Sequence, residues 1–327
     1  MPKKRLSVAL IGAGGNMRNA HMARIAADGA VEIAGVADPV ESQARLLMER
    51  ARRDLPYFPD WRRMLDEVDV DGVLISTPHR EHYRQAKASL ERGRHVLVEK
   101  PLVIRPEDAK RLLALAAGRR LALVVAYQRH WMPHFAYARE LVERGAVGAI
   151  RGVVAYVTQN WLRVGGWRLD PGLAGGGMFM DTGSHLLAAM LWVTGLQPKV
   201  VSASFDNIGR AVDVNGGVVV EFSNDAIGTL TTTGNALHHD ERLAISGSEG
   251  SLVLHLHRWR VRSMLLNDGV VELPKRIKPS TPDAALFRWM RSGLAGYEPQ
   301  DFALQVARLT EAAYRAADER RPVKVRR

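Results

Sequence analysis

The chain has 327 residues, which favours two domains of ordinary size and allows a core large enough to need no disulfide or structural metal. It contains no cysteine, which excludes disulfides, thiolate nucleophiles and cysteine-based zinc sites. The formal net charge is +11, but the basic residues are spread over every predicted element without a helix-turn-helix or zinc-finger pattern, so we expect no nucleic-acid partner.

The start of the chain is basic and is followed by a short apolar run at residues 6–11. This run leads into a glycine turn and not into a segment long enough to cross a membrane. We therefore expect a soluble, cytoplasmic protein with no membrane partner.

The first part of the chain alternates short apolar strands with helical stretches. Such strands, nearly continuous in apolar residues, are typical of a parallel sheet that helices cover on both faces. The sequence thus predicts an α/β fold, with an N-terminal doubly wound Rossmann domain over residues 1–126. The expected strands are 8–11, 31–37, 72–76, 95–98 and 121–126, and the expected helices begin near 19 and span 40–53, 80–92 and 106–117.

After about Tyr127 the pattern changes to alternating strands separated by turn residues, which indicates a large, mostly antiparallel open sheet. We expect residues 127–327 to form a C-terminal α+β domain for substrate binding and oligomerisation, with the last helix and tail packing back on the first domain. The expected strands are 151–158, 199–205, 217–222, 227–233, 242–246, 251–256 and 259–265, and helices are expected near 178–194 and 301–318.

A glycine turn follows the first predicted strand, at Gly12, Gly14 and Gly15. Glycines there allow a tight turn and close approach of a pyrophosphate to a helix N-terminus. Met17 replaces the third glycine of the usual fingerprint and shifts the expected helix start by a residue. Because glycine turns after strands are common, an ordinary connection remains the alternative.

Asp38 ends the second predicted strand, where a carboxylate can accept hydrogen bonds from the adenosine ribose. The alternative is an aspartate that only starts the turn Asp38–Pro39. A 2′-phosphate beside this carboxylate would meet repulsion of roughly 3 kcal/mol per charge, taking about 5 Å and an effective dielectric near 20. No arginine follows directly, so NAD is expected as cofactor and NADP is disfavoured.

A possible reaction centre comes from two separate segments. Lys100 follows a predicted strand, at the edge where open α/β sheets bind ligands. Asp181 and His185 are four apart and share one face of a predicted helix. A cation, an anion and a base titrating near neutrality suit proton transfer to or from an alcohol. The alternatives are a surface Lys100 paired with Glu99, and a capping Asp181 beside a buried His185.

These motifs resemble the Gfo/Idh/MocA oxidoreductases over nearly the full length of the chain. The resemblance implies that the Thr-Pro turn and the Glu-Lys-Pro segment line the nicotinamide, and that Lys100, Asp181 and His185 form the catalytic centre. Two departures are Met17 and His79, the latter at a position where asparagine is common. The residues that carry the resemblance are the glycine turn, Asp38, Ser76, Thr77, Pro78, His82, Glu99, Lys100, Pro101, Trp167, Arg168, Gly175, Gly176, Gly177, Asp181 and His185.

The expected contacts fall into a cofactor set and a substrate set. Aromatic faces and arginine forks suit polyols, although core packing or a subunit interface would explain each such residue equally well. The cofactor set is Gly12, Gly14, Gly15, Asn16, Met17, Asp38, Ser76, Thr77, Pro78, His79, His82, Glu99, Lys100, Gln128 and Arg168. The substrate set is Lys100, Arg129, Trp161, Arg163, Trp167, Asp181, His185 and His238, with His239 as an alternative to His238.

Several histidine pairs have spacings that suggest a metal, but each lacks a clear third ligand, so we expect no metal site. The expected activity is an NAD-dependent dehydrogenase that oxidises a secondary hydroxyl of a sugar, sugar derivative or inositol bound between the domains. The alternative is a redox-neutral, NAD-dependent glycoside hydrolase of the same family. A non-catalytic regulator would not need Lys100, Asp181 and His185 together. The resemblance also implies a homodimer or homotetramer formed through the C-terminal sheet.

Overall fold

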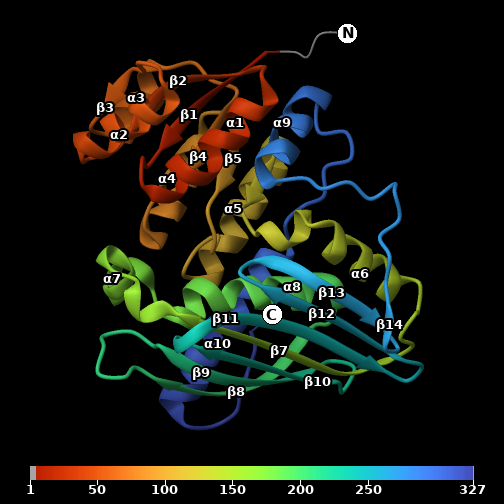
Figure 1. Ribbon diagram of the computed structural model, residues 1–327. Helices are drawn as coiled ribbons and strands as arrows, with labels where there is room; N and C mark the ends of the chain where they lie inside the picture. The colour runs from red at the N-terminus through yellow and green to blue at the C-terminus, as the bar shows by residue number, and fades with distance from the viewer. Residues whose placement is uncertain (1–4, 327) are drawn as a thin grey trace. The chain divides into compact units, whose positions relative to one another are not determined.

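The computed structural model describes residues 5–326, and within them two compact units are distinguished (Figure 1). The first unit comprises residues up to Val103, Glu107–Ala126 and Ser280–Asp301, and the second comprises Ile104–Pro106, Tyr127–Pro279 and Phe302–Arg327. Apart from the short segment Ile104–Pro106, the chain passes from the first unit to the second between Ala126 and Tyr127. The last strand of the parallel sheet, Leu123–Val125, ends just before this point.

The first unit contains a six-stranded sheet in the order β3-β2-β1-β4-β5-β6, and all its strand pairs are parallel. This confirms the expected Rossmann architecture. The order reverses beside β1, which places the glycine turn at the switch point where such sheets bind ligands. The strands are β1 (Leu6–Ile11), β2 (Val31–Ala37), β3 (Tyr57–Phe58), β4 (Gly72–Ile75), β5 (His95–Val98) and β6 (Leu123–Val125).

Most helices of the first unit fall where the sequence predicted them. They are α1 (Met22–Asp28), preceded by the π-helical turn η1 (Met17–His21), α2 (Glu41–Ala51), α4 (His79–Glu91) and α5 (Pro106–Arg119). Two were not predicted, α3 (Trp61–Glu67) and α9 (Pro282–Ser292). Helix α9 packs beside α1, where Arg291 forms an ion pair with Asp28.

The second unit contains a nine-stranded sheet in the order β14-β13-β12-β11-β7-β10-β9-β8-β15. Among the strands of residues 5–326 in this sheet, only β10 and β7 pair in parallel, so the prediction of a large, mostly antiparallel sheet is confirmed. The strands are β7 (Ile150–Asn160), β8 (Pro198–Asp206), β9 (Asn215–Phe222), β10 (Ile227–Thr233), β11 (Asn235–Gly247), β12 (Ser251–His257), β13 (Arg260–Leu266), β14 (Gly269–Val270) and β15 (Val323–Lys324).

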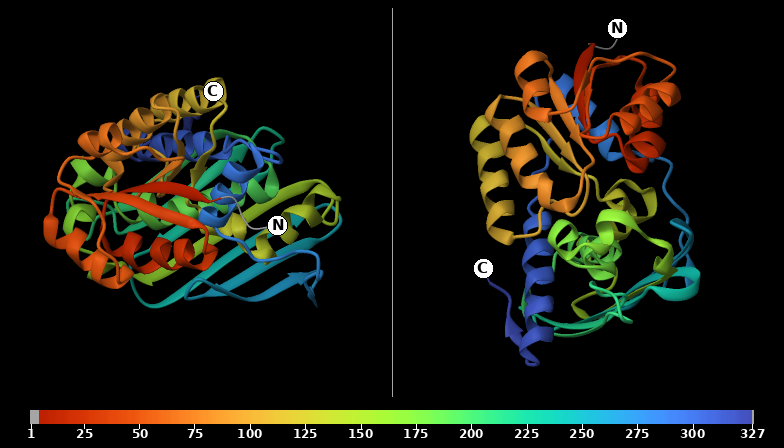
Figure 2. Two further views of the ribbon diagram at one scale, coloured as in Figure 1. Left: turned by 90° about the horizontal axis from the view of Figure 1, so that it is seen from above. Right: turned by 90° about the vertical axis from the view of Figure 1, so that its left-hand side faces the viewer.

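Helices of the second unit cover one face of this sheet. Helix α8 (Ser184–Thr194) packs on β7, α10 (Phe302–Glu319) packs on β8, and α8 also contacts α6 (Pro133–Glu143). Figure 2 shows the sheet nearly edge-on in its right-hand view, with α8 on one side. The shorter elements are η2 (Gln128–Trp131), η3 (Trp161–Arg163), η4 (Gly166–Leu169), α7 (Pro171–Ala174) and the π-helical turn η5 (Phe179–Gly183).

The last part of the chain is divided between the two units. The last helix, α10, and the tail belong to the second unit, whereas the segment that returns to the first unit is residues 280–301 with α9. The reason is the apolar face of α10, which is buried within the second unit through residues such as Val306 and Leu309. In residues 5–326 no helix has both the length and the apolar character that a membrane crossing requires.

Candidate functional site

The glycine turn of the first unit leaves room for a ligand. Gly12 has a φ of +88°, and a Cβ there would overlap the carbonyl oxygen of Ser76, so both its conformation and its surroundings require glycine. A Cβ on Gly14 would meet nothing within 4 Å, and one on Gly15 would meet only the side chain of Asn19 at 3.9 Å. The backbone of this turn is therefore open on one side, as the cradle of a pyrophosphate must be.

The turn accommodates Met17 through its helix geometry. The side chain of Met17 is fully buried, and the chain continues as a π-helical turn before α1 begins. Such widened turns occur often at functional sites. A side-chain contact of Met17 with the cofactor is therefore ruled out, because the side chain fills the core in place of the missing glycine. Only its backbone is left for the cofactor.

Asp38 is held by the backbone on both sides. Its Oδ2 accepts from the amide of Ala13 at 2.8 Å, and its Oδ1 accepts from the amide of Val40 at 2.9 Å. The carboxylate thus stabilises the turn that starts at Asp38, as the alternative interpretation expected. It also holds the backbone of the glycine turn through Ala13. Because a carboxylate offers about four lone-pair sites, two remain for a ribose. Asp38 is half-buried, so those sites are accessible.

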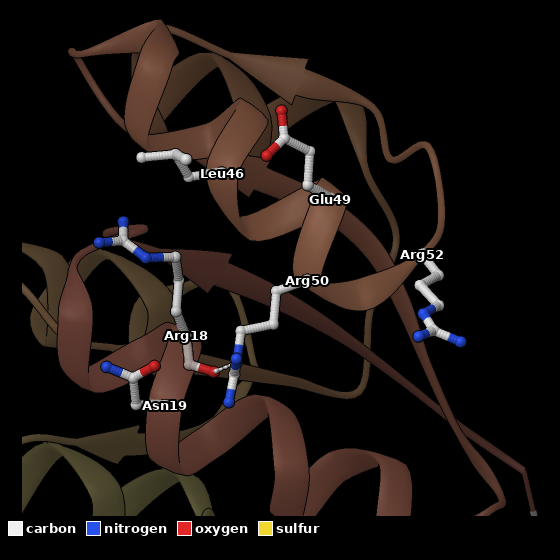
Figure 3. A pocket seen from close by; sticks show the side chains of 6 residues that line it. All are labelled: Arg18, Asn19, Leu46, Glu49, Arg50 and Arg52. Atoms are coloured by element: carbon white, nitrogen blue, oxygen red, sulfur yellow. Dashed lines mark hydrogen bonds between the residues drawn. The ribbon is translucent and has the colours of Figure 1, made fainter.

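A pocket of about 540 Å³ lies beside the glycine turn, between η1 and α2. Figure 3 shows that Arg18 and Arg50 meet there, with Nε of Arg50 donating to the carbonyl of Arg18 at 3.1 Å. Arg18 in turn donates from Nη1 to the carbonyl of Ala13 and to Oε1 of Gln43, both at 2.6 Å. Arg18 therefore supports the glycine turn from outside.

A buried ion network ties this turn to the end of β5. His21 is fully buried, with Nε2 3.0 Å from Oε1 of Glu99 and Nδ1 2.6 Å from Oδ1 of Asp283. Asn16 donates to the same Oε1 of Glu99 at 2.6 Å, and Arg24 pairs with Asp283 at 3.0 Å. Glu99 itself accepts from the amide of the next residue, Lys100, at 3.2 Å.

The network sets the charge state of its members. Burial by itself would lower the pKa of His21, but the adjoining Asp283 and Glu99 carboxylates raise it to about 9. Burial would likewise raise the pKa of Glu99, but the hydrogen bond and charge of His21 hold it below its usual value. At neutral pH the core therefore contains an imidazolium between two carboxylates, which fixes the strand end that carries Lys100.

His82 joins two loops and does not face a ligand. Its ring is fully buried, with Nδ1 2.8 Å from the carbonyl of Pro101 and Nε2 3.0 Å from the carbonyl of Thr77. Burial lowers the pKa of His82, so the ring is neutral and donates to one of these carbonyls. The expected side-chain contact of His82 with the cofactor is therefore wrong. Its role is to hold the Thr77 turn beside the cis Lys100–Pro101 peptide.

In the second unit, Asp213 anchors the segment that leads to α8. This buried carboxylate accepts from the amides of Gly177 and Phe179, each at 2.7 Å, and from the hydroxyl of Tyr314 at 2.6 Å. A Cβ on Gly177 would overlap the backbone of Asp213, and one on Gly176 would overlap the Tyr314 hydroxyl. The glycine run is thus required by close packing around one buried anion.

Asp181 and His185 follow on η5 and the first turn of α8. Oδ2 of Asp181 lies 3.2 Å from Nε1 of Trp161 and 3.4 Å from Nε of Arg168. These two donors fix the orientation of the carboxylate. A Cβ on Gly183 would come within 3.0 Å of the Phe179 ring, which accounts for the poor helix former at this position.

His185 is surrounded by aromatic rings. Its ring lies edge-on to Tyr127 and Trp259, with centroid distances of 5.8 and 5.6 Å, and the residue is 8% exposed. Trp259 also contacts His239, at 4.7 Å between ring centroids. An imidazole held in this way can accept a proton from a hydroxyl that reaches its remaining exposed edge.

Two members of the predicted substrate set are buried. Arg129 is 2% exposed and forms a two-fold ion pair with the fully buried Glu241, so its guanidinium is used within the protein. Trp161 is 1% exposed and acts through its hydrogen bond to Asp181. The expected direct contacts of both side chains with substrate are wrong, because each is enclosed in the core and supports a neighbouring residue.

Apart from Gly12 and Glu99, which are buried, the other predicted residues keep accessible positions with one exception. Ser76, Thr77 and Pro78 follow β4 and are half-buried, as are Lys100, Gln128, Trp167 and Arg168, whereas Arg163 and His238 are exposed. The exception is His79, the first residue of α4, which is buried. The Arg168 guanidinium lies 4.5 Å from the Trp167 ring centroid. Between residues 5 and 326, no three His, Asp or Glu side chains gather closely enough to hold a metal ion.

Sequence reasoning missed several residues that organise these sites. His21, Asp213, Glu241 and Asp283 are buried charged or titratable groups whose partners lie far away in the chain, so no local pattern reveals them. Trp259 left one signal, since neither glycine nor asparagine separates the predicted strand 251–256 from the predicted strand 259–265, which begins with Trp259.

Comparison with known proteins gives matches over most of the chain. Residues 6–127 match the model of an oxidoreductase family with an NAD-binding Rossmann fold, and residues 135–253 match the GFO/IDH/MocA C-terminal domain. A levoglucosan dehydrogenase from Pseudarthrobacter phenanthrenivorans is 28% identical over 292 residues, which cover 78% of this chain and 75% of that protein. A D-glucoside 3-dehydrogenase from Escherichia coli is 33% identical over 216 residues, covering 64% of this chain and 60% of that protein.

A solved structure agrees over nearly the whole length. GenD2 from gentamicin A biosynthesis, in complex with NAD, aligns with a TM-score of 0.83 at 25% identity, over 99% of this chain and 97% of that chain.

Proposed function

This chain belongs to the Gfo/Idh/MocA family of NAD-binding oxidoreductases, and we propose that it oxidises a secondary hydroxyl of a sugar, sugar derivative or inositol. The observation that carries the proposal is the pairing on one helical segment of an oriented carboxylate, Asp181, with an imidazole, His185. Lys100, at the end of a parallel strand, is the third member of the proposed centre.

The first unit fits its cofactor. NAD, when bound, supplies the acceptor for the hydride. We propose that the open backbone of Gly14 and Gly15 holds the pyrophosphate and that the free lone pairs of Asp38 accept from the ribose. The half-buried Thr77 turn and Lys100 complete the cofactor set at the strand ends.

In the proposed reaction, His185 accepts the proton of the substrate hydroxyl. Lys100 donates a hydrogen bond to the same oxygen and stabilises the negative charge that develops on it. Asp181, fixed by Trp161 and Arg168, orients the substrate and balances the charge of Lys100. Trp167, Arg163 and His238 are proposed to contact the substrate further from the reacting carbon.

The experiment is a substrate panel with purified protein and NAD. Because one relative is named for levoglucosan and another for D-glucosides, these compounds lead the panel, followed by free aldoses and inositols. We expect net NADH formation with at least one of them. Release of aglycone without NADH formation would overturn the proposal in favour of the glycoside hydrolase. The named relatives do not support that alternative, because both are dehydrogenases.

We also propose that two or more copies associate through the uncovered face of the nine-stranded sheet. Val154 and Val219 both pair with Thr229 of β10, so they lie side by side, and they are 50% and 45% exposed. Exposed apolar patches of this kind mark interaction surfaces. Light scattering should give a dimer or tetramer, and Val219→Glu should reduce it to a monomer. A wild-type monomer would overturn this proposal.

A further inference from the structure

The turn between β12 and β13 presents a tryptophan in an unusual backbone conformation. Arg258 and Trp259 have φ values of 48° and 67°, and His257 pairs with Arg260, so the loop has two residues. Two-residue hairpin loops with positive φ at both positions strongly favour Asn-Gly or Gly-Gly. Arginine and tryptophan are sterically unfavourable there, and strain of this kind is typically retained where it serves function.

Trp259 is packed on one side and open on the other. Its ring contacts His185 and His239 edge-on, and the guanidinium carbon of Arg129 lies 5.0 Å from its centroid. Nevertheless 41% of the residue is exposed. A tryptophan that served only packing would bury more of its surface, since burial of the indole is what stabilises a core.

A second distortion reaches the same point from β11. Its pairing with β7 breaks between Asn235, opposite Asn160, and Asp240, opposite Thr158, so the β11 chain bulges outward over residues 236–239. His239 lies in this bulge, and its buried Nε2 has no hydrogen-bond partner among the described residues. Bulges beside active sites redirect side chains. Two irregular segments thus bring Trp259 and His239 together next to His185.

We propose that Trp259 is the stacking platform for the ring of the sugar whose hydroxyl His185 deprotonates. This inference rests on the proposed function and names the substrate class, pyranosides with equatorial substituents. With all substituents equatorial, both faces of such a ring carry only C–H bonds and match an indole face, whereas an axial hydroxyl makes one of the two faces polar. An open-chain polyol offers no face at all. The Nε2 of His239 supplies a polar contact for a hydroxyl at the ring edge.

The test compares methyl β-glucopyranoside, its 4-epimer methyl β-galactopyranoside and the open-chain glucitol, each with NAD. Trp259→Ala should raise KM for the glucoside about ten-fold, equivalent to about 1.4 kcal/mol, and Trp259→Phe should raise it less. The preference for glucoside over the other two should largely disappear, with KM for NAD unchanged. Trp61→Ala, a tryptophan of α3 in the first unit, is the matched control and should behave as wild type.

A second variant separates binding from folding. Arg258→Asn combined with Trp259→Gly installs the favoured turn, so its melting temperature should equal or exceed that of Trp259→Ala while KM for the glucoside stays raised. An equal rise in KM for all three substrates, or a KM for the glucoside that is unchanged in both variants, would overturn the proposal that Trp259 is the platform.

A binding measurement distinguishes this inference from the proposed function. Saturating glucoside should change the tryptophan emission of wild type and of Trp61→Phe, and the change should be much smaller in Trp259→Phe, where Trp167 is the remaining tryptophan proposed to contact the substrate. If wild type shows this change without turnover, the platform stands and the proposed reaction fails. If turnover occurs and the emission change in Trp259→Phe is as large as in wild type, the reaction stands and the platform fails. Neither turnover nor an emission change would overturn both.

Discussion

The fully buried imidazole of His21 lies 3.0 Å from the carboxylate of Glu99, 78 residues further along the chain. This ion pair joins the helical turn after the glycines to the strand end that carries Lys100. The second ring nitrogen is held by Asp283 of α9, so a segment from the last quarter of the chain also supports the glycine turn.

Stability should depend on pH through His21. The pKa of its ring is raised from 6.5 to about 9 in the folded state, so its contribution is fully present below pH 6.5 and is lost as pH rises through 9. The loss should be on the order of 3 kcal/mol, at 1.36 kcal/mol per pKa unit. Urea unfolding at several pH values should show this decline in wild type.

The control is His21→Gln, which should be less stable than wild type at pH 6.5 but should lack the decline between about pH 6.5 and 9. The groups that surround the ring are Asp283, Glu99, Arg24 and Asn16, and the variant leaves all four in place. An equal decline in the variant would mean that His21 is not the titrating group.

Gly14→Ala should separate cofactor binding from folding. A Cβ at Gly14 meets nothing within 4 Å, so the melting temperature without ligand should stay within a few degrees of wild type. The methyl group would occupy the space proposed for the pyrophosphate, so the Kd for NAD, from titration calorimetry, should rise at least about ten-fold, or about 1.4 kcal/mol.

The matched control for Gly14→Ala is Gly118→Ala in α5, where a Cβ also meets nothing. This substitution should stabilise the helix by up to about 1 kcal/mol and leave the Kd for NAD unchanged. If Gly14→Ala binds NAD as tightly as wild type, the pyrophosphate does not approach this turn.

Asp38→Asn should weaken discrimination against NADP. The amide keeps an oxygen for one of the two backbone donors, Ala13 or Val40, and removes the charge that repels a 2′-phosphate. We expect the ratio of the Kd values for NADP and NAD to fall by at least about ten-fold, or about 1.4 kcal/mol. Glu41→Gln, an exposed acid at the start of α2, should leave the ratio unchanged.

His185→Ala should lower kcat by about two to four orders of magnitude, as loss of a general base does. NAD binding should persist, because the residues proposed to hold the cofactor pyrophosphate and ribose lie in the first unit. His134→Ala on α6 serves as the control and should retain wild-type kcat. A kcat for His185→Ala close to wild type would remove this residue from the proposed reaction.

Much of the fold follows from patterns that are local in the sequence. Strand and helix periodicity, together with turn residues, predicted both sheets and the helices at 40–53, 80–92, 106–117 and 301–318. Helix α9 was missed although its sequence carries local signals, with Thr281 as N-cap, Pro282 in the first turn and Gly293 directly after the last helical residue. The π-helical turns of η1 and η5 were also missed, since a single extra residue in a turn changes no periodicity that a short window can detect.

The sequence by itself determined the glycine turn, the acid at the end of β2, and Lys100, Asp181 and His185 as candidates, because each belongs to a motif of neighbouring residues. Only the tertiary structure decided which polar groups are used up inside the protein. The guanidinium of Arg129 is paired with the carboxylate of Glu241, 112 residues away, and the two ring nitrogens of His82 each lie beside a backbone carbonyl. A buried charge or polar ring must find a partner wherever the fold brings one, and that choice depends on contacts between remote segments, which no local pattern encodes.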